Sequence, residues 1–267
     1  MKDYPVVLSI AGSDPSGGAG IQADIKSISA CGGYAATAIT AVTVQNTLGV
    51  SGVEYLPSEL VERQIDAVMS DLAVDAVKIG MTGTVPVIEA IARQLTAHPV
   101  LYVVTDPVMV STSKDSLTLP EAVDALCAHI FPKSHIVTPN IDEASRLAGF
   151  RIGSVEDMDR AAMLLRDRYR CAFLVKGGDL NADSTSTDVL CDLDGVVHFT
   201  SERVDTVNLH GTGCTLSSSI ATFLGAGRPM REAVHSAISY VHGAIAAAAS
   251  LRIGHGHGPL RHLWRED

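Results

Sequence analysis

The chain has 267 residues and a formal net charge of −10 at pH 7, and 46% of its residues are hydrophobic. This length is enough for a large core in one α/β domain, and we expect a single domain over residues 1–267 because no linker-like stretch or internal repeat divides the chain. The acidic balance argues against nucleic acid or an anionic membrane as the main partner.

Cysteine usage and hydropathy bear on the compartment. The five cysteines form no CxxC pair and show no metal-ligand spacing, which is typical of a reducing compartment. The early apolar run 6–11 is too short for a signal peptide, and no segment approaches the roughly 20 apolar residues of a membrane span. We therefore expect a cytoplasmic protein without membrane contact.

Short apolar runs alternate with amphipathic helical patterns along the chain. In chain order we expect strand 5–10, helix 21–30, strand 36–44, helix 58–70 with Ser58 as N-cap, strand 76–79, helix 84–95, strand 100–106, helix 120–130, strand 136–138, helices 141–147 and 155–168, strand 172–176, strands 187–193 and 196–202, a helix from Cys214, and helix 230–251. Strands that alternate with helices and are almost continuously apolar predict a mostly parallel sheet covered on both faces. Ligands of such sheets gather at the carboxyl ends of the strands.

A first glycine cluster follows strand 5–10. Gly18, Gly20 and Ala23 satisfy the G-x-G-x-x-A pattern of dinucleotide-binding proteins, which leaves a dinucleotide-dependent oxidoreductase as one alternative. That pattern also needs an acidic residue about 20 positions later, but no Asp or Glu occurs between Asp24 and Glu54. A loop that closes its glycine backbone over a small ligand is the better interpretation, and a plain strand–helix turn remains open.

Polar side chains stand at the ends of three later strands. Asp106 ends one strand, Asn140 and Glu143 follow the next, and Lys176 ends a third. Carboxylate and amide oxygens suit Mg²⁺, and a lysine suits phosphate, so together they predict Mg²⁺-dependent phosphoryl transfer. Each residue taken alone could equally be a helix cap or a surface charge.

The segment HGTGCT (210–215) runs directly into an apolar helix. Its two glycines, Gly211 and Gly213, allow a tight turn, and the first-turn amides of the helix form a pocket for anionic oxygen. Cys214 stands at this pocket, where a thiolate is favoured and could accept a proton from an alcohol. The alternative is a glycine-rich helix start that buries a small cysteine. For His210 we expect a hydrogen-bonded structural role.

Taken together, these segments resemble the hydroxymethylpyrimidine/phosphomethylpyrimidine kinases of thiamine synthesis, within the ribokinase superfamily, over nearly the whole chain. The matching motifs, in order, are SIAGSDPSGGAGIQAD (9–24), TAVTVQNT (40–47), KIGM (78–81), DPVM (106–109), TPN (138–140) with Glu143, KGG (176–178) and GTGCT (211–215). The resemblance implies a ribokinase-like three-layer α/β/α fold, use of ATP and Mg²⁺, and a homodimer.

The resemblance also implies residue roles. The pyrimidine site would contain Gln45 on the ring, with Asp24, Met81 and Gly20 around it. The ATP and metal site would use Lys176, Thr212 and Asn140 for the nucleotide, and Glu143 and Asp106 for Mg²⁺. The catalytic residues would be Cys214 as the base, Lys176, and the amides of Gly211 and Gly213.

Two departures and two further alternatives qualify the resemblance. Ser113-Lys114-Asp115 and Asp179 differ from the family pattern in segments that we expect to be loops, so they bear on a lid rather than on the reaction. A pyridoxal or pyridoxine kinase could use the same residues on a pyridine ring. A non-catalytic ligand sensor is disfavoured, because the base, lysine and acidic positions are all present.

Overall fold

A computed structural model of the chain describes residues 4–109, 120–178, 180 and 184–265. The strands of the described residues are β1 (Val6–Ser13), β2 (Tyr34–Asn46), β3 (Gly49–Tyr55), β4 (Ala76–Ile79), β5 (Tyr102–Thr105), β6 (Ile136–Val137), β7 (Ala172–Val175), β8 (Thr185–Asp192) and β9 (Gly195–Glu202). Their helices are α1 (Gly20–Ala30), α2 (Ser58–Met69), α3 (Val85–Ala97), α4 (Pro120–Ala125), α5 (Ile141–Ala148), α6 (Val155–Tyr169), α7 (Thr212–Gly225) and α8 (Met230–Ala248), with a π turn η1 (Leu126–Ile130) and a 3₁₀ turn η2 (Phe131–Lys133).

The nine strands found in the described residues form one sheet in the order β3-β2-β1-β4-β5-β6-β7-β8-β9. All neighbours from β2 to β7 are parallel, whereas β3 pairs antiparallel with β2, and β8 and β9 extend the other edge antiparallel. The expected mostly parallel sheet is confirmed, and the helical crossovers that parallel pairs require account for the alternation of strands and helices along the chain.

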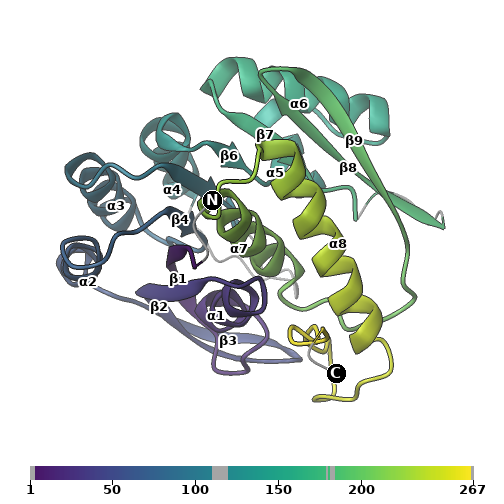
Figure 1. Cartoon of the computed structure of the whole chain (residues 1–267), viewed down its shortest axis with the longest axis horizontal. Helices are drawn as coiled ribbons and strands as arrows, with labels where there is room; N and C mark the ends of the chain where they lie inside the picture. The colour runs from purple at the N-terminus through teal and green to yellow at the C-terminus, as the bar shows by residue number, and fades with distance from the viewer. Residues whose placement is uncertain (1–3, 110–119, 179, 181–183, 266–267) are drawn as a thin grey trace.

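Helices cover both faces of the sheet (Figure 1). Consecutive residues of a strand point to opposite faces, so Leu8 packs with α2, α3 and α4 while Val7 packs with α1, α7 and α8. In β7, Phe173 likewise packs in the same cluster as Leu8, and Leu174 packs in the same cluster as Val7. Strands buried on both faces explain the near-continuous apolar runs, and the expected three-layer α/β/α architecture is confirmed.

Three local expectations were wrong. Strand β3 was not expected; it pairs antiparallel with β2 as a hairpin, and two glycines in its seven residues weaken the strand signal in the sequence. The helix expected over 120–130 is α-helical only to Ala125 and continues as the π turn η1. The N-cap of α2 is Pro57, and Ser58 is instead the first helical residue.

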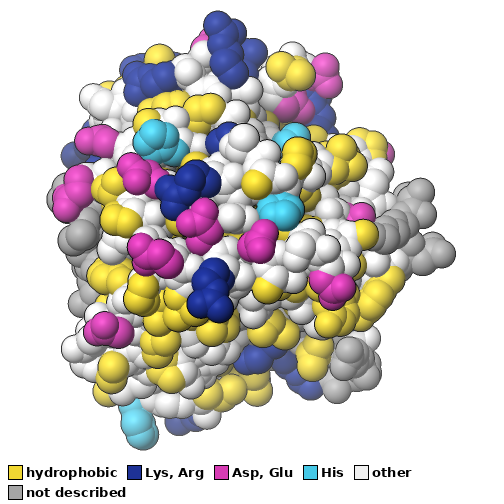
Figure 2. All heavy atoms as spheres, turned by 90° about the vertical axis from the view of Figure 1, so that its left-hand side faces the viewer, with side chains coloured by type: hydrophobic (Ala, Val, Ile, Leu, Met, Phe, Trp, Pro, Cys, Tyr) yellow, Lys and Arg dark blue, Asp and Glu magenta, His cyan; other side chains and the backbone are white. Residues whose placement is uncertain are grey.

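The side of the molecule formed by α2 and α3 has a mixed surface. Figure 2 shows acidic, basic and apolar side chains interspersed on this face. An ion pair of 2.9 Å between Glu62 and Arg93 joins the two helices there. Among the described residues, no helix combines the length and the apolar character that crossing a membrane would need.

Candidate active site

Three of the predicted site residues, Asp106, Asn140 and Lys176, follow strands that end at the same edge of the sheet. Because β1, β4, β5, β6 and β7 run parallel, their carboxyl ends meet at that edge. Asp106 directly follows β5, Asn140 lies three residues beyond β6, and Lys176 directly follows β7. A backbone bridge joins Asn140 to Lys176, so the tertiary structure brings together segments that are well separated in sequence.

Lys176 and Asp106 form the central ion pair of this edge. The Lys176 Nζ lies 2.9 Å from Asp106 Oδ1, and the two side chains are only 16% and 4% exposed. The Thr138 hydroxyl donates to the same carboxylate oxygen at 3.4 Å. Burial alone would lower the pKa of Lys176, but Asp106 and Glu143 raise it overall, so the ammonium keeps its positive charge.

Asn140 and Glu143 form a capping box at the start of α5. The Asn140 side chain accepts from the Glu143 backbone N–H at 2.9 Å, and the Glu143 carboxylate accepts from the Asn140 N–H at 2.9 Å and from the Met109 N–H at 3.2 Å. The helix start thereby fixes Glu143 in a buried position. Burial raises the pKa of Glu143 to about 7, opposed by Lys176 and supported by Asp106.

The acidic side chains fit a magnesium ion that is completed by other ligands. Within the described residues, no three His, Cys, Asp or Glu side chains converge as a metal site. Asp106 is nevertheless close enough to Glu143 to help raise the pKa of Glu143, and carboxylate oxygens are the ligands that Mg²⁺ prefers. Mg²⁺ usually keeps several waters and shares substrate phosphates, so this pair suits a nucleotide-bound ion.

Glycines bring the start of α7 against the Lys176–Asp106 pair. Gly211 has φ +84°, and a Cβ there would lie 1.8 Å from the Gly18 carbonyl oxygen, so this position requires glycine. A Cβ on Gly213 would lie 3.1 Å from Asp106 Oδ2 and 3.2 Å from Lys176 Nζ. The first turn of α7 therefore approaches the ion pair at van der Waals distance.

The backbone amides of this turn are oriented for an anion. Thr212 N–H donates to the Leu209 carbonyl and Thr215 N–H to the Gly211 carbonyl, while the N–H groups of Gly213 and Cys214 donate to none of the described residues. The Thr212 hydroxyl is bonded to the Leu209 carbonyl at 2.7 Å. Helix-start N–H groups without protein acceptors, next to a lysine, are the arrangement that binds anions in other proteins, so the expected anion pocket stays a prediction that this geometry suits.

Cys214 occupies the expected place but not the expected protonation state. Its sulfur accepts from the Gly20 N–H, and its side chain is partly exposed. Surrounding protein nonetheless raises its pKa to about 11: burial is the main cause, Lys78 opposes it, and Asp24 and Asp106 add to it. The expectation of a favoured thiolate was wrong in this respect, because desolvation outweighs the helix start.

Gln45 lies in a polar network with His210 and Asp14. His210 Nε2 lies 2.9 Å from Asp14 Oδ2 and 3.4 Å from Gln45 Nε2, and Gln45 Oε1 accepts from the Thr43 hydroxyl at 3.1 Å. His210 and Asp14 are buried. The expected hydrogen-bonded structural role of His210 is confirmed, and it links the segment before α7 to Gln45.

Gly20 and Met81 lie around the end of β1. Gly20 has φ +56°, and a Cβ there would lie 2.3 Å from the Gly12 carbonyl oxygen. A Cβ on Gly12 would lie 3.0 Å from the Met81 sulfur. The backbone carbonyl of Met81 accepts a hydrogen bond from the Thr40 hydroxyl at 2.6 Å. The glycine loop therefore packs against β1, and closure of the loop over a ligand stays a prediction.

Asp24 does not have the contacts expected of a substrate ligand. Its carboxylate is fully buried and accepts from the Lys78 ammonium, the Ser9 hydroxyl and the Ser218 hydroxyl; the last two bonds are 2.6 Å long. Every carboxylate oxygen thus has two protein donors. The expected place of Asp24 in the pyrimidine pocket stays a prediction, and what the structure shows is a carboxylate that protein donors already satisfy.

Asp188 is a site neighbour that the sequence reading missed. It lies on β8, and its Oδ1 accepts from the Gly177 N–H at 2.8 Å, directly after Lys176. Burial raises its pKa to about 6, while the Gly177 N–H and Lys176 act in the opposite direction. Its strand pairs antiparallel with β7, a contact that no local motif announces.

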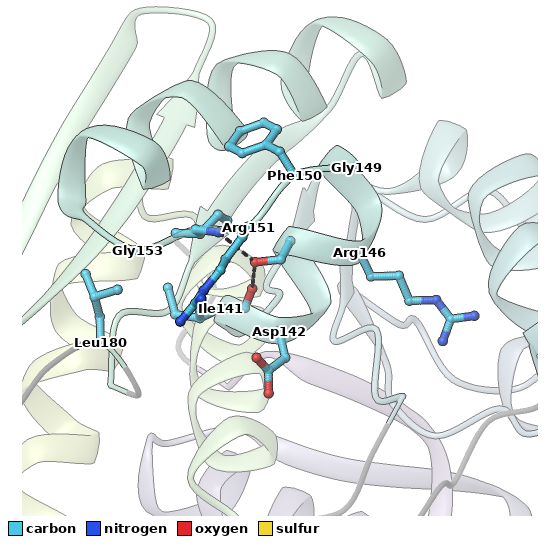
Figure 3. Close-up of a pocket in the computed structure, with 10 residues that line it drawn as sticks. Ile141, Asp142, Arg146, Gly149, Phe150, Arg151, Gly153 and Leu180 are labelled. Carbon is cyan, nitrogen blue, oxygen red and sulfur yellow. Dashed lines mark hydrogen bonds between the residues drawn. The ribbon is translucent and has the colours of Figure 1, made fainter.

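A pocket of about 760 Å³ lies beside this cluster (Figure 3). Its walls come from α5, the segment between α5 and α6, and Leu180. Figure 3 shows the Arg151 side chain running past Ile141, whereas Arg146 points away from the other labelled side chains. None of the predicted site residues lines this pocket.

Ser113-Lys114-Asp115 and Asp179, the departures from the family pattern, lie outside the described residues.

Known proteins resemble this chain along nearly its whole length. A family model for phosphomethylpyrimidine kinase matches residues 14–261. The hydroxymethylpyrimidine/phosphomethylpyrimidine kinase of Rhizobium meliloti (strain 1021) is 49% identical and aligns over 97% of each chain. The phosphomethylpyrimidine kinase structure from Clostridium difficile 630 is 39% identical with a TM-score of 0.80, covering 90% of this chain and 99% of that one.

A pyridoxal kinase is also structurally similar. The Staphylococcus aureus enzyme in complex with AMP-PCP and pyridoxal has a TM-score of 0.90 and 32% identity, covering 99% of this chain and 96% of that one. The two kinds of kinase share one ribokinase-like fold. The match to the phosphomethylpyrimidine kinase family model, and the 49% identity to a hydroxymethylpyrimidine/phosphomethylpyrimidine kinase against 32% to the pyridoxal kinase, decide to which of them this chain is more similar. This chain belongs to the phosphomethylpyrimidine kinase family.

Proposed function

We propose that this protein transfers phosphate from ATP to 4-amino-5-hydroxymethyl-2-methylpyrimidine and then to the resulting monophosphate, giving the diphosphate used in thiamine biosynthesis. The observation that carries the proposal is the approach of Gly213 to the Lys176–Asp106 pair, which places two free amides, an ammonium and Cys214 in one cluster. Phosphoryl transfer depends mainly on positioning and on stabilising charge, and this cluster supplies both.

The nucleotide phosphates would bind between Lys176 and the first turn of α7. The ammonium and the amides of Gly213 and Cys214 stabilise the charge that develops on the transferring oxygens. Asn140 and Thr212 lie at the two helix starts that flank this position. Asp106 and Glu143 would hold Mg²⁺, which when bound neutralises phosphate charge.

The pyrimidine would bind on the β1 side, with Gln45, Met81 and the Gly20 loop around its ring. A glutamine amide can pair with an amino group beside a ring nitrogen through one acceptor and one donor. The hydroxymethyl oxygen then attacks the γ-phosphorus of ATP, the bond to the leaving ADP oxygen breaks, and Cys214 receives the hydroxyl proton. Because burial disfavours the thiolate, positive charge nearby must favour it, and Lys78 acts in that direction.

The finer assignments belong to the same proposal. We propose that Mg²⁺ is the metal, that the protein is a cytoplasmic homodimer, and that residues 1–267 form one kinase domain. The cysteine usage supports the cytoplasmic assignment, the single sheet of the described residues supports one domain, and the carboxylates of Asp106 and Glu143 support Mg²⁺, whereas the homodimer rests on the family resemblance alone.

The deciding experiment is a steady-state assay with Mg·ATP in which hydroxymethylpyrimidine, its monophosphate and pyridoxal are offered in parallel and products are resolved by mass. Phosphorylation of both pyrimidines is the expected result. Phosphorylation of pyridoxal alone would reject the substrate assignment while keeping the phosphotransfer site. Failure with all three would reject the proposal.

A further inference from the structure

A fully buried ion pair lies near the start of α7, and in the reaction described above neither of its side chains touches the substrate or ATP. Lys78 of β4 places its Nζ 2.9 Å from Asp24 Oδ1 and 2.8 Å from Oδ2, and both side chains are 0% exposed. Two hydrophobic residues of similar volume are often at least as stabilising as a buried ion pair. The contribution of this pair to the stability of the protein therefore does not explain its presence. Its hydrogen bonds to the helices of the site are more informative.

The pair is connected to the helix that carries Cys214. Ser218 of α7 donates its hydroxyl to Asp24 Oδ1 at 2.6 Å, and the Gly20 N–H donates to the Cys214 sulfur. Gly20 and Asp24 are four residues apart in α1, and Cys214 and Ser218 are four residues apart in α7. Residues at this spacing share one face of a helix. Helices α1 and α7 are thus joined at two points, one turn apart.

The two joints differ in strength. Hydrogen bonds to an ionised acceptor are shorter and roughly twice as strong as neutral ones, whereas a thiol is a weak acceptor. The Ser218–Asp24 bond is therefore the stronger of the two, and the Lys78 ammonium lies against the same carboxylate oxygen at 2.9 Å. Ser9 of β1 donates to the other carboxylate oxygen at 2.6 Å, which anchors Asp24 to the sheet as well.

We propose that Asp24 and Lys78 form a positioning unit for Cys214, which acts through Ser218 by fixing the first turns of α7 against α1. The inference rests on the proposed function, in which Cys214 faces the hydroxymethyl group of the substrate. It gives Asp24 a positioning role in place of the ligand role that the family resemblance implies. The charged groups that interact electrostatically with the thiol are Lys78, Asp24, Asp106 and Lys176, and Lys78 lowers the pKa of Cys214 most.

Two neighbouring serines of α7 provide a matched test. Ser218→Ala removes the bond to Asp24. Ser219→Ala removes a hydroxyl that is equally buried, but Ser219 donates to the Thr215 carbonyl of its own helix at 2.7 Å and accepts only a 3.5 Å bond from the Cys31 thiol at the end of α1, which is a weak donor. The two variants share the same chemical change on the same helix, and only the first removes the bond to the Asp24 carboxylate.

The readouts are hydrogen exchange of a peptide covering 212–218 and steady-state kinetics. Ser218→Ala is expected to exchange about fivefold faster over this peptide, as a local loosening requires. Its kcat for the hydroxymethyl substrate should fall about tenfold with an unchanged KM for ATP, and less for the monophosphate. Ser219→Ala should match the wild type in each measurement. The inference is overturned if the two variants behave alike in exchange or in kcat.

A paired variant tests the ion pair itself. Asp24→Leu combined with Lys78→Met removes both charges, so neither is left unpaired in the core. The expected result is a cooperatively folded protein with fast exchange over 212–218 and a kcat at least about tenfold lower for the hydroxymethyl substrate. Wild-type exchange and kcat in this variant would overturn the inference. If the wild type phosphorylates neither pyrimidine, the proposed function fails, and the exchange comparison alone decides whether the unit positions Cys214.

Discussion

The Lys176 ammonium lies 2.9 Å from Asp106 Oδ1, although 70 residues separate the two in the chain. The parallel pairing of β5, β6 and β7 brings them to one edge of the sheet, and Gly213 lets the first turn of α7 approach them. A cation held in place by a carboxylate, next to free amides, is preorganised for phosphate before any ligand arrives.

Replacing Lys176 with methionine should impair both phosphorylations alike. The ammonium acts on the phosphates of ATP, which are common to the two reactions, so we expect kcat to fall about 100-fold or more with each substrate. Lys133→Met removes a half-buried lysine that donates to the Thr96 hydroxyl, and should leave kcat unchanged. The measurement is product-resolved kinetics; a loss confined to one substrate would contradict the assignment.

Replacing Cys214 with alanine should separate the two phosphorylations. The hydroxymethyl group must lose a proton, and losing a general base typically costs about 100-fold or more. A phosphate monoester has a second pKa of about 6, so the second acceptor is already anionic and should lose less than about threefold. Equal losses would show that Cys214 serves the anion pocket and not as a base.

The raised pKa of Cys214 also predicts a pH profile. With a pKa of about 11, the thiolate fraction grows throughout the neutral and mildly alkaline range. We expect kcat for the first phosphorylation to rise with pH between about 6.5 and 9, and the second to lack this rise. Kinetics of wild type and Cys214→Ala at several pH values check this, and a slope that persists in the variant would assign it to another group.

Two glycines with the same backbone conformation should respond very differently to alanine. Gly211 has φ +84° and would place a Cβ 1.8 Å from the Gly18 carbonyl oxygen, whereas Gly149 has φ +80° and open space around it. Gly149→Ala should lower the free energy of unfolding by about 1 kcal/mol, the cost of strain alone. Gly211→Ala should cost at least about 2 kcal/mol more, because the backbone must move. Urea unfolding measures both; similar losses would mean that the loop yields freely.

Burial of Glu143 predicts a dependence of stability on pH. Its native pKa of about 7 lies above the usual value of 4.5, so the native state binds more protons than the unfolded state between these two pH values. The free energy of unfolding should therefore fall as pH rises through this window, by up to about 3 kcal/mol for this group. Glu143→Gln cannot ionise and should show a shallower fall.

The control for this effect is Asp142→Asn, which changes an exposed acid in the same helical turn and should keep the wild-type slope. Urea unfolding at pH 4.5, 6 and 7.5 compares the three proteins. Identical slopes in wild type and Glu143→Gln would show that the carboxylate ionises in the native state as it does in water.

The sequence predicted the elements whose signals are local. The buried strand β7 has a continuous apolar run, and the helix expected over 141–147 matches α5 to within one residue. The sequence did not predict the hairpin strand β3, because its pairing with β2, and not its own composition, makes it a strand. The sequence did not point to Asp188 for the same reason. Its contact with the Gly177 N–H depends on the pairing of β8 with the neighbouring strand β7.

By itself the sequence determined the three-layer fold, the family and the edge of the sheet where the site lies, because periodicity, turn residues and motif order are properties of the chain. Only the tertiary structure decided how the charged groups are used. It buried Asp24 against Lys78 and raised the pKa of Cys214 where a helix start alone predicts a lower one. Desolvation and ion pairing depend on which distant segments pack together, and no local pattern encodes that packing.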